Sequence, residues 1–256
     1  MSKRLRLSEL SVGTTRPSRF CGEYRIIAIQ GWNKIKICFT NTGYTKTVSL
    51  SEINTGSIKD FYYPTVVGIG YLGVGCYPTS YKRGDKTMHT PAYEAWTSRL
   101  QLCYGNTNFA HRYKDIGVYV CEEWLCFQNF AEWFYKQIKL YGKGGVVDKD
   151  LLHLGSKVYS PQTCCYIPQC INVMFRRSSG KNTGVYPNQS GKWYVSIGGK
   201  KSRKRYGTYS TENDAVDAYR REKITLVQNT AVEFQDKIDP ALFYKLYTGA
   251  ENYVDY

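Results

Sequence analysis

The chain lacks any long apolar run. No segment of its 256 residues approaches the length of about 18 apolar residues that a membrane-spanning helix needs. Residues 1–7, with the sequence MSKRLRL, also lack an apolar stretch of signal-peptide length. We therefore expect a soluble protein of the cytoplasm with no membrane partner.

The cysteine pattern argues against a disulfide framework. The chain has nine cysteines, an odd number, and no Cys-x-x-Cys pair. Without a secretory signal, we expect these thiols to be free and buried. A structural zinc ion is the less favoured alternative, because the spacing of its candidate ligands gives it little support. These candidate ligands are His111, Cys121, Cys126, Cys164, Cys165 and Cys170.

A phosphate-binding loop is also missing. Gly68, Gly70, Gly73 and Gly75 form a glycine-rich series, but no Gly-Lys-Ser/Thr opens a helix after it. The series therefore predicts a linker.

Acidic residues are scarce relative to basic ones. The chain has 21 Asp and Glu against 35 Lys and Arg, which gives a formal net charge of +14. The excess is concentrated between Arg176 and Lys223, where twelve basic residues stand against four acidic ones. This charge favours a polyanionic partner, because phosphates bind cations. The 24 tyrosines are compatible with such a partner, since Tyr can stack on bases as well as build a core.

The first part of the chain predicts a basic arm followed by a small β domain. Residues 1–18 are polar and basic, and we expect a mobile arm there. Residues 19–75 contain short runs of alternating polar and apolar residues separated by Asn and Gly turns. This pattern predicts a small antiparallel domain, either barrel-like or an open sheet, for which a structural or docking role is favoured.

Two helices are expected at the start of residues 76–176. Each predicted helix has one apolar stripe, which is typical of a face that packs into a core. The second helix should begin near Glu122, with Glu122 and Glu123 in its first turn, where the helix dipole favours negative charge. The stripes consist of Tyr93, Trp96, Leu100 and Cys103 in the first helix, and of Trp124, Phe127, Phe130, Trp133 and Phe134 in the second.

The segment 146–175 predicts a compact strand, loop, strand and helix. Asp148 and Asp150 lie one residue apart at the end of the first strand, and Asn172 lies on the helix. Two carboxylates and an amide oxygen can hold a divalent cation. The alternative, which the spacing alone favours, is that both carboxylates make turn and capping bonds. The predicted elements are a strand at 146–152, a turn at Gly155, a strand at 158–161 and a helix from Pro161 toward Phe175.

The sequence predicts a basic linker at residues 177–182. It then predicts three strands and a helix at residues 183–234, followed by a helical tail at residues 235–256. Within 183–234 the strand residues alternate between two faces. One face would pack on the helix, and the other would stay open. The packed face contains Trp193, Val195 and Ile197 against Ala215, Ala218 and Tyr219, with Thr211 as helix N-cap, and the open face contains Lys192, Tyr194 and Ser196.

The segment 183–234 also resembles the ethylene-response-factor (Apetala-type) DNA-binding domain. The matching residues are Gly184, Val185, Gly191, Lys192, Trp193, Ile197, Tyr206, Gly207, Thr208, Tyr209, Thr211, Asp214, Ala215, Ala218 and Tyr219. The resemblance implies that the open face lies in the major groove of double-stranded DNA. Several positions that are Arg in the plant members are Tyr or Asn here, so it carries the binding mode and not the sequence preference. The implied contact positions are Tyr186, Asn188, Lys192, Tyr194, Ser196, Lys204 and Tyr206.

Residues from about 90 to 175 look similar to the HNH-type homing endonucleases of bacteriophages, and the glycine series at 68–75 is similar to the front part of such proteins. The matching residues are Tyr93, Trp96, Cys103, Tyr104, Tyr113, Lys114, Asp115, Val120, Cys121, Glu123 and Trp124, followed by Asp148, Lys149, Asp150, Tyr159, Ser160, Pro161, Thr163, Cys164, Pro168 and Asn172.

This second resemblance implies hydrolysis of phosphodiester bonds by Asp148, Lys149, Asp150 and Asn172. Asp148, Asp150 and Asn172 would hold Mg²⁺ or Mn²⁺. In the family a His on the first strand acts as general base, and Lys149 stands in its place. A protonated Lys cannot accept a proton. Either the carboxylates act on a metal-bound water, or the nuclease is attenuated or inactive.

Taken together, the sequence predicts an α+β protein with a small N-terminal β domain, a central helical and HNH-like (ββα-metal) module, and a C-terminal three-stranded antiparallel sheet packed on one helix. The first functional hypothesis is a phage-encoded, metal-dependent homing endonuclease that acts in the host cytoplasm. The alternative is a catalytically inactive DNA-binding regulator or host-takeover factor built on the same scaffold. A third is a protein that docks on a host enzyme through its N-terminal strands.

Overall fold

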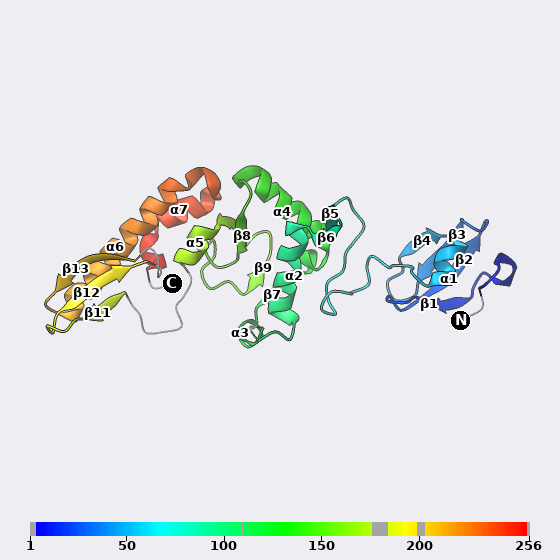
Figure 1. Ribbon diagram of the computed structural model, residues 1–256, viewed down its shortest axis with the longest axis horizontal. Helices are drawn as coiled ribbons and strands as arrows, with labels where there is room; N and C mark the ends of the chain where they lie inside the picture. Colours follow the sequence, from blue (N-terminus) through cyan, green and yellow to red (C-terminus); the bar gives the residue numbers. More distant parts are fainter. Residues whose placement is uncertain (1–3, 109, 176–183, 199–202, 255–256) are drawn as a thin grey trace. The chain divides into compact units, whose positions relative to one another are not determined.

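The structure is a computed structural model that describes residues 4–108, 110–175, 184–198 and 203–254 (Figure 1). It is of the mixed α+β class, as the sequence predicts. The chain divides into two compact units, Met1–Trp133 and Phe134–Tyr256. In the described part of the chain, no helix is both long enough and apolar enough to cross a membrane.

The first unit begins with a four-stranded antiparallel meander in the order β1-β2-β3-β4 (Figure 1). Alternation along β3 buries Ile35, Ile37 and Phe39, and helix α1 adds Ile53 to the same core. Ser49 caps α1 by accepting the backbone N–H of Glu52. The elements are β1 (Thr15–Pro17), β2 (Glu23–Ile29), β3 (Ile35–Phe39), β4 (Thr45–Val48) and α1 (Leu50–Thr55).

Residues 4–18 are part of this unit, so the prediction of a mobile arm is wrong for them. Strand β1 pairs with β2, and a short 3₁₀ helix, Leu7–Glu9, precedes it. Leu10 is buried in the core of the meander. The backbone of Leu5 exchanges two hydrogen bonds with the amide side chain of Asn54. Because the segment is rich in basic residues, its composition does not reveal that its leucines anchor it to the core. Residues 1–3 lie outside the described residues.

The glycine series at 68–75 packs against the helices that follow, which corrects the prediction of a linker. A Cβ atom at Gly70 would collide with the side chains of Leu100 and Trp96, and one at Gly73 with Cys126. Between these glycines, Tyr71 donates its N–H to the carbonyl of Leu125 at 2.9 Å. The glycines therefore allow a close approach of the backbone.

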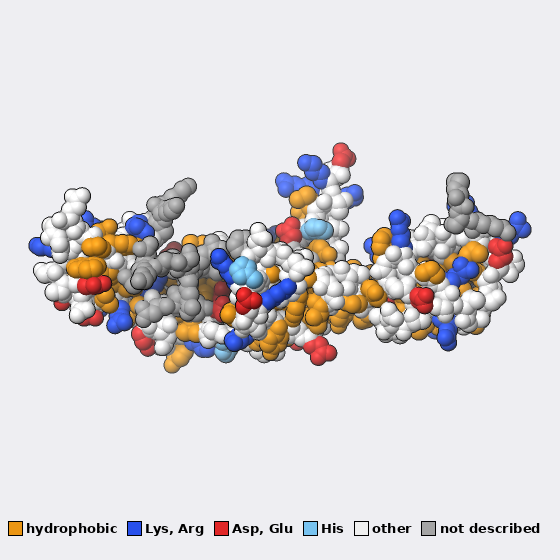
Figure 2. Space-filling view, turned by 90° about the horizontal axis from the view of Figure 1, so that it is seen from below, with side chains coloured by type: hydrophobic (Ala, Val, Ile, Leu, Met, Phe, Trp, Pro, Cys, Tyr) orange, Lys and Arg blue, Asp and Glu red, His pale blue; other side chains and the backbone are white. Residues whose placement is uncertain are grey.

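The first predicted helix is confirmed as α2 (Pro91–Tyr104), which buries Trp96, Leu100 and Cys103. The second begins later than expected, as α4 (Phe127–Tyr141), because Cys126 is extended. Glu122 and Glu123 lie in a separate 3₁₀ turn before it. The remaining elements of this unit are the hairpin of β5 (Ser80–Arg83) and β6 (Lys86–His89), whose tip projects in Figure 2, together with α3 (His111–Lys114) and β7 (Tyr119–Val120).

The second unit contains a strand, loop, strand and helix, but with other boundaries than predicted. Strand β8 (Gly145–Asp148) pairs antiparallel with β10 (Cys165–Pro168), and α5 (Gln169–Met174) follows directly. The partner of β8 is thus not the predicted strand at 158–161, of which only β9 (Val158–Tyr159) forms. Ser160 and Thr163 hydrogen-bond to each other and make a turn where the helix was expected to begin.

The C-terminal sheet and its helix are confirmed. Strands β11 (Val185–Pro187), β12 (Trp193–Ile197) and β13 (Lys204–Tyr209) are antiparallel, in that order. Val185, Val195 and Ile197 form a core with Ala215 and Ala218 of helix α6 (Glu212–Glu233). Thr211 caps this helix by accepting the N–H of Asp214 at 3.1 Å.

Helix α6 continues past the sheet into a second core. Its later residues Val227 and Ala231 are buried with Ile167 of β10 and Ile171 of α5. Helix α7 (Pro240–Thr248) and the 3₁₀ helix Ala250–Tyr253 complete this core. The C-terminal tail therefore packs back on the chain, and one helix connects the core of the sheet to that of the β8–β10–α5 segment.

Candidate nucleic-acid interface

The face of the β11–β13 sheet that points away from α6 carries two stacked tyrosines. Tyr186 of β11 lies opposite Tyr194 of β12 in the sheet register. Their ring centroids are 5.4 Å apart and the rings are inclined by 28°. Val195, the next residue along β12, points to the opposite face and is fully buried against α6. We call the surface around the two tyrosines the open face.

Two arginines lie over these rings. The guanidinium carbon of Arg205 is 4.5 Å from the centroid of Tyr194, and that of Arg203 is 5.4 Å from the centroid of Tyr186. Arg205 also donates a hydrogen bond to Thr208 at 2.9 Å. Cation–π contacts hold a guanidinium plane while its other N–H groups stay available to an anion. Both arginines are exposed.

A β-bulge decides which basic residues reach the open face. The register shifts between Val195, which lies opposite Gly207, and Ser196, which lies opposite Arg205. The shift leaves Tyr206 as the extra residue, so Arg205 shares the face of Tyr194. Without the shift, Lys204 and Tyr206 would alternate onto that face together with Thr208.

The predicted contact positions therefore divide into three groups. Tyr186 and Tyr194 lie on the open face, and Lys192 is exposed just before β12. Lys204 lies opposite the buried Ile197 and contacts the ring of Tyr206, which packs toward the α6 core.

The third group consists of a turn residue and a buried residue. Asn188 accepts hydrogen bonds at its Oδ1 from the N–H groups of Ser190 and Lys192, both at 3.0 Å, so it shapes the turn between β11 and β12. Ser196 is only 6% exposed, so its hydroxyl is not part of the accessible surface.

Sequence reasoning missed Arg203, Arg205 and Thr208. One signal was present: Gly207 lies inside a strand, and a glycine in such a place often marks a bulge. Its φ of +150° is one that side-chain-bearing residues rarely adopt. A bulge at this position shifts the alternation of strand β13 by one residue, so Arg205 instead of Lys204 shares the face of Tyr194.

The charge around this sheet is separated between its two sides. Residues 184–211 contain six Lys and Arg and no Asp or Glu. Helix α6, on the other face, has five acidic residues (Glu212, Asp214, Asp217, Glu222 and Glu233) against three basic ones (Arg220, Arg221 and Lys223). A polyanion is therefore attracted to the open face rather than to the helix.

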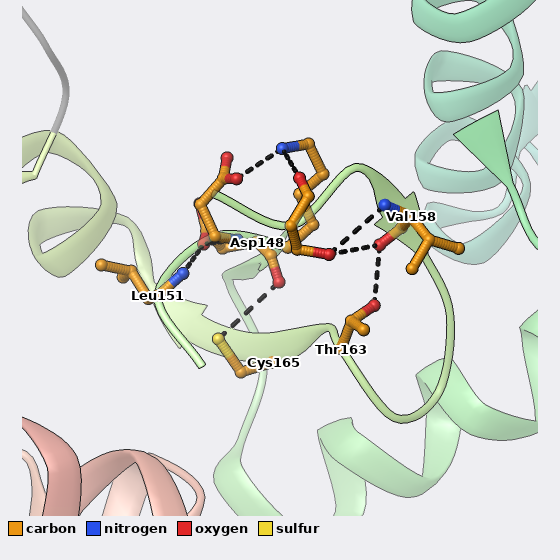
Figure 3. A network of polar contacts seen from close by, with 8 residues as sticks. Asp148, Leu151, Val158, Thr163 and Cys165 are labelled. Atoms are coloured by element: carbon orange, nitrogen blue, oxygen red, sulfur yellow. Dashed lines mark hydrogen bonds and ion pairs between the residues drawn. The ribbon is translucent and has the colours of Figure 1, made fainter. Parts of the chain in front are cut away.

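Asp148, at the end of β8, makes turn bonds. Its Oδ1 accepts the backbone N–H of Asp150 at 2.9 Å and that of Leu151 at 2.8 Å (Figure 3). On the facing strand, the thiol of Cys165 approaches the carbonyl of Asp148 at 3.7 Å. Burial raises the pKa of the Asp148 carboxyl, and the two backbone bonds oppose this rise.

Lys149 is 5% exposed, and its ammonium is held by two acceptors. It forms an ion pair with Oδ1 of Asp150 and donates to the carbonyl of Ser156 at 2.6 Å. The ring of Tyr159 lies 5.9 Å from its Nζ. The ammonium therefore neutralises one of the two candidate carboxylates.

The C-terminal helices hold the loop that follows Asp150. Lys245 of α7 donates to the carbonyl of Leu152 at 2.6 Å, and the hydroxyl of Tyr253 donates to that of Leu151 at 2.8 Å. Burial raises the pKa of Tyr253 to about 12, so its hydroxyl stays protonated and able to donate. These bonds fix the loop from the side of α7.

Asn172 is not joined to the carboxylates. It lies half-buried on α5, and within the described residues no hydrogen bond or ion pair links its side chain to Asp148 or Asp150. Across 4–108, 110–175, 184–198 and 203–254, no group of three or more His, Cys, Asp or Glu is placed to hold a metal ion. Asp148 thus makes the bonds of the turn-and-capping alternative, whereas the carboxylate of Asp150 pairs with Lys149. Cys21, Cys126 and Cys165 are buried free thiols, as predicted, but Cys76 and Cys170 are exposed, so the prediction of burial is wrong for these two.

No known protein family, characterised protein or solved structure matches the chain. Both resemblances therefore depend on the motif residues alone. The similarity of the β8–β10–α5 segment to the HNH-type endonucleases stays a prediction. So does the similarity of the C-terminal sheet to the ethylene-response-factor domain.

Proposed function

We propose that the protein binds double-stranded DNA through the open face of its β11–β13 sheet. One observation carries the proposal: the Tyr186–Tyr194 stack, with the guanidinium groups of Arg203 and Arg205 over its rings. Each strand contributes to this surface or borders it, so the surface is continuous over the sheet.

The chemistry of this surface suits a duplex. Guanidinium forks can donate two bonds to a phosphate or to the O6 and N7 atoms of guanine. Tyrosine hydroxyls bind phosphate oxygens. The lack of carboxylates in residues 184–211 removes the repulsion that a phosphate backbone would otherwise meet.

Titration of a fluorescent duplex pool at several salt concentrations tests the proposal. The double variant Arg203→Ala/Arg205→Ala should weaken binding on the order of tenfold or more. It should also lower the slope of log affinity against log salt by about 2, because each phosphate contact contributes about 0.9. The matched control is Arg220→Ala/Arg221→Ala, which removes two exposed arginines of α6. Equal losses in both double variants, or no duplex binding by the wild type, would contradict the proposal.

Metal-dependent DNA cleavage is the second candidate function. The observation that favours it is the order β8, loop, β10 and α5, with Asp148 at the end of the first strand. If Mg²⁺ or Mn²⁺ binds, Asp148 and Asp150 are the residues that would hold it. The ion pair of Lys149 with Asp150 opposes this, since it already places a cation beside that carboxylate. We therefore favour binding without cleavage, the role of a regulator or host-takeover factor.

A further inference from the structure

The hairpin of β5 and β6 is a second basic surface, and it lies in the first unit. Ser80 pairs with His89, Tyr81 with Met88, Lys82 with Thr87 and Arg83 with Lys86. A two-residue turn, Gly84-Asp85, connects the strands, and Gly84 has a φ of +59°. A glycine with positive φ at the first position is what a type II′ hairpin turn requires.

The base of the hairpin is fixed to the start of α2. The N–H of Thr90 donates to the carbonyl of Thr79 at 3.0 Å, and its hydroxyl donates to that of Pro78, also at 3.0 Å. The same hydroxyl caps α2 by accepting the N–H of Tyr93. The ring of His89 lies 5.0 Å from that of Tyr93. The ribbon therefore projects from an anchored base.

The tip is exposed and basic. From Tyr81 to His89 the strand residues are all exposed. The ribbon carries Lys82, Arg83 and Lys86 against Asp85, a formal charge of 3 − 1 = +2 with His89 neutral. Figure 2 shows Lys and Arg side chains gathered where the hairpin projects from the surface of its unit.

One face of the ribbon combines apolar and basic side chains. Residues that lie opposite each other share a face, so Tyr81 and Met88 lie on the same side as Arg83 and Lys86. Tyr81 is 46% and Met88 37% exposed. An isolated two-stranded hairpin is only marginally stable in water, so contact of this face with a partner would add to its stability.

We propose that the β5–β6 ribbon enters the major groove of a DNA duplex as a second contact. The groove is about 12 Å wide and admits a two-stranded ribbon, whose strands lie about 4.8 Å apart. Lys82, Arg83 and Lys86 bind phosphates at the groove edges, and Tyr81 and Met88 contact apolar base edges such as the thymine methyl group. The choice of DNA as occupant rests on the proposed function and on the charge of the ribbon.

The test compares two triple variants of the full chain in duplex titrations at several salt concentrations. Lys82→Ala/Arg83→Ala/Lys86→Ala removes the cations of the ribbon. Lys34→Ala/Lys36→Ala/Lys59→Ala removes three exposed lysines elsewhere in the same unit, for an equal change in net charge. The ribbon variant should weaken binding on the order of tenfold and lower the salt slope by about 3. The control variant should stay within about twofold of the wild type.

The outcomes separate the two proposals. If the ribbon variant binds as the control variant does, while Arg203→Ala/Arg205→Ala loses binding, the ribbon proposal is overturned and the sheet proposal stands. If only the ribbon variant loses binding, the sheet proposal is overturned and the ribbon proposal stands. If the wild type binds no duplex, both are overturned. Losses in the ribbon variant and in the sheet variant, with the control unchanged, support both.

Discussion

Lys149 and Asp150 are neighbours in the chain and also form an ion pair, in which the lysine side chain is 7% and the aspartate side chain 29% exposed. Lys149 stands where the resemblance to HNH-type endonucleases places a general base. Its ammonium is a hydrogen-bond donor to Asp150 and to the carbonyl of Ser156. A group in this state supplies a fixed cation and holds a loop, but it cannot take a proton from water.

The first prediction concerns cleavage. Wild-type protein incubated with supercoiled plasmid and Mg²⁺ or Mn²⁺ should leave the plasmid intact, as should Asp148→Ala, because Asp148 is bonded to the loop backbone and Asp150 to Lys149. Agarose gels over a time course measure the nicked and linear forms. Nicking by the wild type that disappears in Asp148→Ala would establish the nuclease and overturn this expectation.

The second prediction concerns stability. Lys149→Ala should lower the free energy of unfolding by about 1.5–3 kcal/mol, since it leaves a carboxylate and a carbonyl without their charged donor. Urea denaturation followed by circular dichroism measures the change. The control is Lys157→Ala, which removes an exposed lysine of the same loop. Equal stability of the two variants would show that the ion pair contributes nothing measurable.

Much of the fold could be predicted from periodicity. The spacing of Trp96, Leu100 and Cys103 identifies the buried side of α2, and the alternation of Val195 and Ile197 identifies the packed side of β12. The boundaries of helices and strands are harder to predict, because each depends on the backbone conformation of one or two residues. The extended Cys126 delays α4, and the Ser160–Thr163 turn moves the strand that pairs with β8.

The site could be predicted only in part. Alternation identified Tyr194 correctly, because the core side of β12 is apolar and its other side polar. The positions on β13 that the resemblance implies, Lys204 and Tyr206, do not share this face, since a bulge moves the register by one residue and exchanges the two faces. The roles of Lys149 and of Asn188 depend on contacts made by their polar atoms, which no periodicity reports.

The third prediction compares two neighbouring basic residues. Arg205→Ala should weaken duplex binding and lower the salt slope by about 1, because Arg205 lies on the open face over Tyr194. Lys204→Ala should weaken binding on all sequences but with a smaller change in slope, because Lys204 lies opposite Ile197. Parallel anisotropy titrations of the two single variants measure both slopes. A larger loss for Lys204→Ala would place the register of β13 in doubt.

Lys223 joins helix α6 to the end of helix α5. It lies on α6, is 7% exposed, and donates to the carbonyl of Met174 at the end of α5 at 3.3 Å. Its Nζ lies 5.6 Å from the ring of Phe175. Burial lowers the pKa of Lys223 from the ordinary 10.5 of lysine. The charged ammonium is thus less favourable in the folded than in the unfolded state.

The fourth prediction is the pH dependence that follows. Between the lowered folded pKa of Lys223 and the unfolded value of 10.5, the unfolded chain binds the proton and the folded chain does not. Stability from this group therefore rises with pH through that window. Lys223→Met removes the penalty and also the hydrogen bond to the carbonyl of Met174. The stability of the variant relative to the wild type should therefore be highest at pH 7 and fall as the pH approaches 10.5. Thermal unfolding of both proteins between pH 7 and 10.5 measures the difference in their stability at each pH. Because all other groups titrate in both proteins, their contributions cancel in this difference. A difference that stays constant over this range would mean that the pKa of Lys223 is the same in both states.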